Sequence, residues 1–179
     1  MKLSEIDKNF AVQPVDAEGL CWTDAHAPCF SLHGLLPCGR GFMRMPHAIA
    51  EQVNSGVANL SANTSGGRLR FVTNSTRLAI KTEMPRFRIP HMADMGSSAF
   101  DVTVEENGAV HTTLLPPAYE WEGGDYTCNI TLGESQLRQL TINFPLYNDV
   151  LALGADGNAS REVYYLPRLD SDRLGYASV

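Results

Sequence analysis

The chain has 179 residues, a formal net charge of −6, 44% hydrophobic residues and 19% charged residues. This length and composition suit one globular domain and exclude a disordered chain. The negative charge argues against a nucleic-acid partner, and no apolar run reaches the roughly 20 residues of a membrane span. Acidic residues near the start leave no apolar core for a signal peptide, so we expect a cytoplasmic protein with no membrane partner.

The four cysteines lack the close Cys-x-x-Cys spacing that structural zinc sites usually contain. Three of them nevertheless interleave with two histidines, which keeps a zinc site open as the minor alternative. Free, mostly buried thiols are the favoured interpretation. We therefore predict neither a metal nor a cofactor. The cysteines are Cys21, Cys29, Cys38 and Cys128.

Before residue 60 the chain shows little regular pattern apart from short apolar stretches at 10–15 and 29–35. Residues 46–60 are the one plausible helix, or a pair of short turns, because Ile49 and Val53 fall at four-residue spacing. An Asn-Ser-Gly sequence weakens the middle of this segment. We interpret it as a connector lying against a sheet.

Residues 63–83 predict two strands and a turn. Leu69 and Phe71 alternate with basic residues such as Arg68, so one row of side chains should face a core and the other should face out. The sequence Thr-Asn-Ser-Thr at 73–76 has the side chains that favour a turn, which predicts that the two strands return as a hairpin.

Beyond residue 84 the pattern is again that of short strands. Prolines mark 84–95 as a loop or edge segment, and Asn-Gly at 107–108 predicts a tight hairpin turn. Strands are expected at 99–105, 110–115, 126–132, 137–144 and 147–153, with a loop at 154–160 and a further strand start at 163–166. Together these elements predict an all-β, antiparallel, jelly-roll-like β-sandwich with little helix. It should occupy residues 1–160, and 161–179 should be a tail or the start of a linker.

No nucleophile elbow, phosphate loop or zinc-protease motif occurs, so no catalytic residue is predicted. Single residues remain as candidate contacts to a ligand or to a neighbouring domain. An acidic residue between apolar strand neighbours suits either a structural hydrogen bond or a ligand cleft, and a basic row suits either solvent or an acidic or sugar partner. Aromatic residues suit either packing or a stacking platform for a sugar. The candidates are Asp101, His91, Trp121, Tyr119 and Arg68.

Four blocks then occur in a fixed order, at residues 62–75, 79–81, 91–102 and 141–150. In this order the blocks resemble the β-sandwich domain that precedes the catalytic domain in bacterial SGNH, or GDSL-type, hydrolases. The Gly-x-Asp-Leu-Tyr signature of that domain corresponds to residues 99–103. Ala99, Val102 and Thr103 stand where the signature has glycine, leucine and tyrosine.

The resemblance implies a non-catalytic accessory domain whose partner is an SGNH hydrolase catalytic domain, in cis or in trans. Such a domain would help to shape the substrate cleft of an ester hydrolase, and acylated carbohydrate is one candidate substrate. At 166–168, Leu-Pro-Arg stands where the nucleophilic Gly-x-Ser motif is expected. No catalytic residue is therefore carried over.

Two alternatives remain open. The first is a free-standing carbohydrate-binding module, and the second is a small hydrolase whose site the motifs do not reveal. An exposed strip of aromatic residues would favour the module, whereas a large unpartnered apolar patch would favour docking to another domain.

Overall fold

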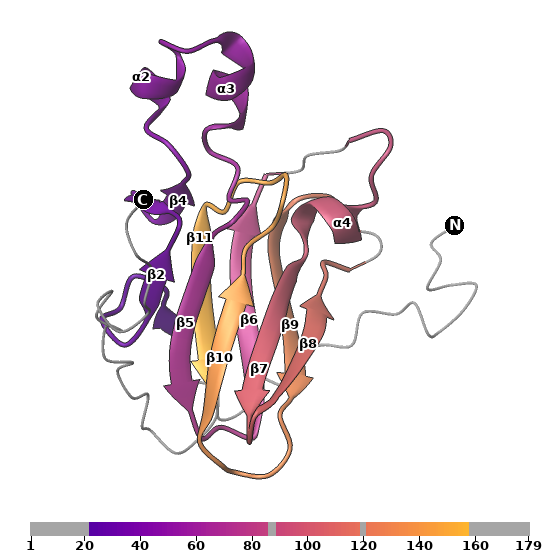
Figure 1. Cartoon of the computed structure of the whole chain (residues 1–179). Helices are drawn as coiled ribbons and strands as arrows, with labels where there is room; N and C mark the ends of the chain where they lie inside the picture. Colours follow the sequence, from indigo (N-terminus) through magenta and orange to yellow (C-terminus); the bar gives the residue numbers. More distant parts are fainter. Residues whose placement is uncertain (1–21, 86–88, 119–120, 158–179) are drawn as a thin grey trace, which may run out of the picture.

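Two antiparallel sheets face each other in the computed structural model, which describes residues 22–85, 89–118 and 121–157 (Figure 1). One sheet has the strand order β1-β11-β6-β9 and the other has the order β2-β5-β10-β7-β8. A separate hairpin is made by β3 and β4. The helix-poor, two-sheet architecture confirms the predicted all-β sandwich.

The four-stranded sheet consists of β1 (Thr23–Asp24), β6 (Arg77–Met84), β9 (Gly124–Thr131) and β11 (Ala152–Gly157). The five-stranded sheet consists of β2 (Ser31–His33), β5 (Arg68–Thr73), β7 (Phe100–Glu106), β8 (Ala109–Leu115) and β10 (Arg138–Asn143). The small hairpin is β3 (Leu36–Cys38) and β4 (Gly41–Met43), and the described helices are α2 (His47–Ala50), α3 (Ser55–Leu60) and α4 (Asp94–Ser98).

The core lies between the sheets and follows the period-two patterns of the sequence. Leu69 and Phe71 of β5 are buried, as predicted, and their register partners on β10 are Ile142 and Leu140. Each such side chain contributes about 1.5–3 kcal/mol when fully buried. The Asn-Gly turn between β7 and β8 is also confirmed, because both of its residues, at φ 50° and 79°, have the left-handed backbone that this turn requires.

The predicted hairpin at residues 63–83 is wrong. β5 pairs with β2 and β10, whereas β6 pairs with β9 and β11, so the turn at 74–76 carries the chain from one sheet to the other. The alternation identified the inward faces correctly, since Leu78 and Ile80 of β6 are fully buried. It could not identify partner strands, because the same inward row suits a strand in either sheet.

The last described strand is also shifted from its predicted place. β11 covers Ala152–Gly157, which includes residues predicted as a loop, while most of 147–151 is irregular. β11 lies between β1 and β6, so backbone pairing on both sides holds Gly154 in the ladder. The strands suggested at 10–15 and 163–166 lie outside the described residues.

Residues 45–62, hereafter the arm, contain α2 and α3 and project beyond one end of the sheets (Figure 1). The predicted connector against a sheet is therefore wrong. Ile49 and Val53 are 54% and 60% exposed, so their four-residue spacing marks an uncovered face. Asn54 caps α3 by accepting a hydrogen bond from the Val57 backbone N–H at 2.9 Å.

None of the helices within the described ranges is long and apolar enough to cross a membrane.

Candidate functional site

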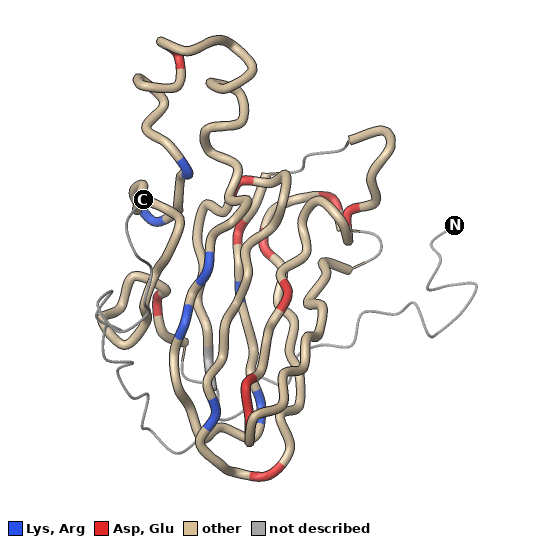
Figure 2. Tube along the Cα trace, viewed as in Figure 1, with Lys and Arg blue, Asp and Glu red and all other residues tan. Residues whose placement is uncertain are grey.

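Two predicted contact residues, Arg68 and Asp101, belong to one row on the outer face of the five-stranded sheet. Asn143 of β10 stands between them, in register with both. Its amide Nδ2 donates to the Asp101 carboxylate at 2.5 Å. Figure 2 shows basic positions on β5 and acidic positions on β7, with β10 between them. The carboxylate is thus held within the sheet, which is the structural role considered for it.

The other three predicted residues do not join this row. His91 is exposed in a turn closed by a bridge between Ile89 and Met92. Trp121 is only 8% exposed and belongs to the core. Tyr119 lies outside the described residues. The five residues therefore do not form one site.

A stacking platform built on Trp121 and Tyr126 is excluded by their burial. The two rings meet edge to face, with centroids 5.6 Å apart and an interplanar angle of 77°. The Tyr126 hydroxyl donates to the Ser98 carbonyl at 3.0 Å. Burial raises the pKa of Tyr126 far above its usual value, so this hydroxyl stays protonated and keeps its hydrogen bond.

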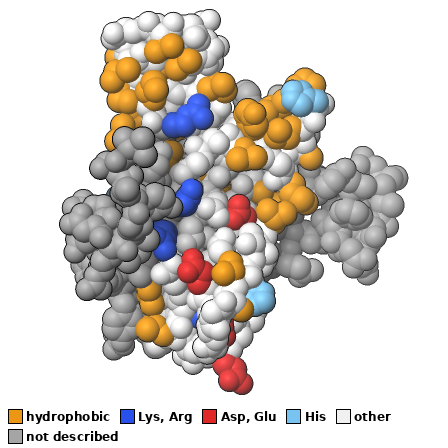
Figure 3. Space-filling model, in the orientation of Figure 1, with side chains coloured by type: hydrophobic (Ala, Val, Ile, Leu, Met, Phe, Trp, Pro, Cys, Tyr) orange, Lys and Arg blue, Asp and Glu red, His pale blue; other side chains and the backbone are white. Residues whose placement is uncertain are grey.

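The feature that motif analysis missed is an apolar surface at the end of the sandwich that carries the arm, α4 and the loop between β10 and β11 (Figure 1). Of the twelve large hydrophobic side chains exposed among the described residues, seven lie in these three segments. They are Ile49, Val53, Leu60, Met95, Leu146, Tyr147 and Leu151, hereafter the apolar end. Figure 3 shows hydrophobic side chains gathered on the arm and on the opposite shoulder of this end.

The three segments of the apolar end carry few charges, namely the carboxylates of Glu51, Asp94 and Asp149. Within the arm, Glu51 is the one acidic residue and no lysine or arginine occurs, as Figure 2 shows. Solvated surfaces normally carry charges of both signs, and large apolar patches without them mark interaction sites. The sequence did contain this signal, as apolar residues in a segment with a single charged residue, but their exposure is visible only in the structure.

Buried polar side chains fix the loops beneath the apolar end. Asn148 donates from Nδ2 to the Pro85 carbonyl and to Ser98 Oγ, both at 3.0 Å, and its Oδ1 accepts from the Asp149 backbone N–H at 2.9 Å. Thr64 Oγ1 donates to the Asn148 carbonyl at 3.1 Å. Nearby, Asn63 Nδ2 donates to Asp149 Oδ1 at 2.8 Å. Three of the four sequence blocks of the family resemblance thus meet in this network.

A recess of about 240 Å³ opens at the base of the arm. Apolar side chains dominate its lining, among them Phe42, Met43, Met45 and Val150. Close backbone contact seals one side, since a Cβ on Gly41 would lie 2.4 Å from the Val150 carbonyl oxygen. Glycine is therefore required at position 41, and the recess has a fixed wall.

One contact in the arm has the residue types of a hydrolase triad. His47 Nδ1 lies 3.2 Å from Ser61 Oγ, and His47 Nε2 lies 3.4 Å from Glu51 Oε1. The serine hydroxyl, however, donates to the Ala58 carbonyl at 2.8 Å, and Ser61 is only 3% exposed. A nucleophile needs a hydroxyl that is free to attack and directed at a base. We therefore interpret this contact as structural.

Metal-ligating side chains do not gather in groups of three or more within the described residues. Cys29, Cys38 and Cys128 are free thiols. Burial raises the pKa of Cys128 to about 12, and a thiol with so high a pKa is a poor nucleophile at neutral pH.

The sequence profile of one family, described as GxDLY, the N-terminus of SGNH hydrolase-type esterases, matches residues 20–160. Among curated proteins, no sequence matches the chain.

Solved structures of low sequence identity share the fold. A protein described as a GDSL-like lipase from Bacteroides ovatus ATCC 8483 gives a TM-score of 0.70 at 18% identity, over 83% of this chain and 43% of the lipase. The salicylyl-acyltransferase SsfX3 from a tetracycline biosynthetic pathway gives 0.60 at 19% identity, over 84% of this chain and 42% of the transferase. The chain therefore spans less than half the length of either protein.

Proposed function

The chain belongs to the family of N-terminal domains of SGNH hydrolase-type esterases, and from this membership we propose that it packs on an SGNH catalytic domain through the apolar end. In this arrangement the chain supplies no catalytic group. The partner supplies the ester-hydrolysing chemistry, and the sandwich supplies a rigid support beside it.

The apolar end is the observation that supports this proposal. Its seven exposed side chains come from three segments that are far apart in sequence, and buried hydrogen bonds hold two of those segments, α4 and the β10–β11 loop, in place. A preorganised apolar surface loses little conformational entropy on binding, which favours a stable interface. The recess at the base of the arm suits one apolar side chain of the partner domain.

The arm also supports a role in shaping the partner's substrate cleft. It extends beyond the sheets (Figure 1), so a domain packed on the apolar end would have the arm along its flank. We infer that α2 and α3 form part of a cleft wall, with Ile49 and Val53 facing the partner.

Hydrogen–deuterium exchange of the full chain, alone and with an SGNH catalytic domain from the same source, tests the docking surface. We expect slower exchange at 45–62, 94–98 and 144–151 in the mixture. The double variant Ile49→Asp/Val53→Asp should lose this protection, because it places two charges in the interface.

The matched control is Val110→Asp/Leu137→Asp, since these two residues are equally exposed but lie away from the apolar end. This variant should keep the protection. Protection confined to the outer face of either sheet, or no protection with a folded catalytic domain, would refute docking through the apolar end.

A second function, sugar binding, is favoured by one separate observation, the half-exposed Trp22. It is developed below.

A further inference from the structure

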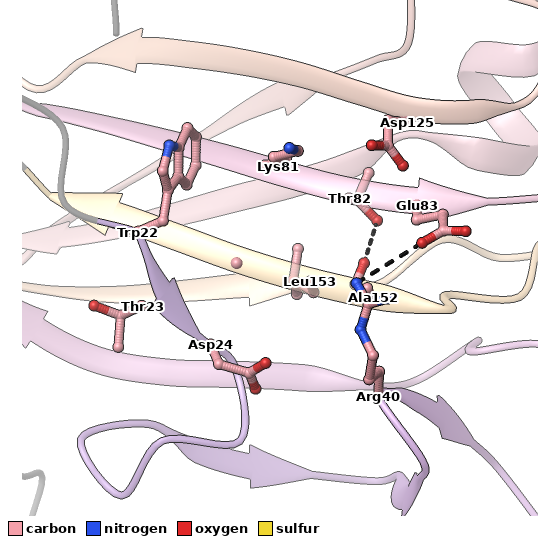
Figure 4. A pocket seen from close by; sticks show the side chains of 11 residues that line it. Trp22, Thr23, Asp24, Arg40, Lys81, Thr82, Glu83, Asp125, Ala152 and Leu153 are labelled. Carbon is pink, nitrogen blue, oxygen red and sulfur yellow. Dashed lines mark hydrogen bonds and ion pairs between the residues drawn. The ribbon is translucent and has the colours of Figure 1, made fainter. Parts of the chain in front are cut away.

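A pocket of about 260 Å³ lies on the outer face of the four-stranded sheet. Its lining comes from all four strands of that sheet and from the turn between β3 and β4. Figure 4 shows the Trp22 indole on one side of the pocket and the carboxylates of Glu83 and Asp125 on the other. Nothing in the proposed docking function uses this pocket.

Small residues on β11 create the hollow. Ala152 and Gly154 are successive outward positions of this strand, between Asp24 of β1 and the long side chains of Lys81 and Glu83 on β6. A Cβ built on Gly154 would lie 3.9 Å from Cε3 of Trp22, so the indole stands directly over the glycine. The short side chains thus form a floor, and the longer ones form walls.

The aromatic side chain is available to a ligand. Trp22 is 39% exposed, in contrast to Trp121 in the core. Aromatic faces carry a negative quadrupole and attract the polarised C–H groups of a ring that stacks on them. An indole that stands at a hollow, beside polar side chains, therefore has the geometry of a ligand platform.

The polar groups present both hydrogen-bond acceptors and donors. Three carboxylates, of Asp24, Glu83 and Asp125, face two cations, Arg40 and Lys81. Arg40 also reaches Glu83, with Nη2 3.9 Å from Oε2. A ligand with a strong charge of either sign would meet repelling groups, whereas a hydroxyl both donates to carboxylates and accepts from cations.

One of these carboxylates is held in a fixed position. Asp24 Oδ1 accepts the His26 backbone N–H at 2.8 Å and lies 2.9 Å from His26 Nδ1. The backbone hydrogen bond is the main cause that lowers the pKa of Asp24, so the acceptor stays ionised at neutral pH.

We propose that this pocket, hereafter the Trp22 pocket, binds a neutral sugar ring by stacking it on Trp22 and bonding its hydroxyls to the surrounding charged side chains. The pocket volume of about 260 Å³ lies below the roughly 300–1,000 Å³ typical of sites for drug-sized ligands, so the pocket suits a small ligand such as one sugar ring. Such a site would keep a carbohydrate chain near a partner esterase without taking part in chemistry.

Saturation-transfer NMR on the full chain tests the proposal. The probes are neutral methyl glycosides of xylose, glucose, galactose and mannose, with methyl glucuronoside and glucosamine as charged counterparts. We expect saturation transfer to the ring C–H protons of at least one neutral glycoside, with a Kd in the millimolar range. Trp22→Ala and Asp125→Ala should each weaken that binding at least fivefold.

Asn129→Ala is the matched control, because Asn129 is exposed on the same sheet but does not line the Trp22 pocket. It should bind the same glycoside as tightly as the parent chain. Urea unfolding midpoints of all variants show whether each is folded.

Three results would overturn the proposal. They are no transfer to any neutral glycoside, unchanged binding in folded Trp22→Ala, and binding of a charged probe alone. None of them bears on docking at the apolar end, so the two proposals fail independently.

Discussion

Replacing Asn148 by alanine should loosen the loops beneath the apolar end and destabilise the whole domain. Asn148 is 1% exposed, and its side chain makes three hydrogen bonds, to the Pro85 carbonyl, Ser98 Oγ and the Asp149 N–H. Alanine removes all three bonds.

The loss of unfolding free energy depends on which of the three hydrogen-bond partners of Asn148 water can reach. Pro85 is exposed, so water replaces the donor that its carbonyl loses. Buried Ser98 Oγ keeps its contact with Ser97 Oγ at 3.2 Å, so it loses one hydrogen bond, worth about 0.5–1.5 kcal/mol. The N–H of half-buried Asp149 is left without its acceptor, which costs about 1–3 kcal/mol. The two remaining partners together should therefore lower the free energy of unfolding by about 2–4 kcal/mol.

Urea unfolding followed by fluorescence, to which buried Trp121 contributes, measures this change. With a slope of about 2 kcal/mol per molar urea, the midpoint should fall by about 1–2 M. Asn129→Ala, an exposed asparagine on β9, should shift it by less than about 0.3 M. Hydrogen exchange should also quicken at 94–98 and 144–151 in the Asn148 variant. A midpoint equal to that of the Asn129 control would refute the reasoning.

Three further outcomes are expected. Phe71→Ala should lower the free energy of unfolding in urea by about 3–5 kcal/mol, because it opens a cavity in the core. Arg70→Ala, on the outer face, should lower it by less than about 1 kcal/mol. Equal losses for the two variants would contradict the assigned faces of β5. The chain alone should not hydrolyse p-nitrophenyl acetate above a denatured control, because the Ser61 hydroxyl is buried and donates to a carbonyl; turnover abolished by Ser61→Ala would show the opposite. Iodoacetamide at pH 8 should alkylate exposed Cys38 but not partly buried Cys128. A thiol with a pKa of about 12 has only about one part in ten thousand of thiolate at that pH, and the alkylation rate of Cys128 should rise about tenfold per pH unit. Equal labelling of the two cysteines in peptide mass spectrometry would contradict the raised pKa of Cys128.

The faces of the strands were predictable from sequence, but their partners were not. Period-two alternation placed Leu69, Phe71 and Ile80 in the core correctly, because side-chain direction in a strand is a local property. Pairing depends on the whole chain, so the turn at 74–76 was misread as a hairpin. Gly154 was assigned to a loop for the same reason, since its place in β11 rests on two neighbouring strands.

The candidate site was predictable only in part. Motif blocks identified the family, and three of them carry the polar network under the apolar end. Single residues chosen by chemical type were less informative, because type does not determine exposure. Trp121 and Trp22 are alike in sequence terms, yet one is part of the core and the other stands over a pocket.

The chain crosses from one sheet to the other between β5 and β6, and this arrangement affects how the domain folds. Among the strands that the structure describes, consecutive ones pair with each other only in the β3–β4 and β7–β8 hairpins, so little of either described sheet can form from neighbouring segments. Folding that depends on distant pairings is slow, on the order of milliseconds to seconds.

The position of β11 adds a constraint on timing. It lies between β1 and β6, so the four-stranded sheet stays open until residues 152–157 have left the ribosome. At about 5–20 residues per second, the earlier strands would wait several seconds with unpaired edges. A domain that follows in the same chain would therefore begin to emerge just as this sandwich closes.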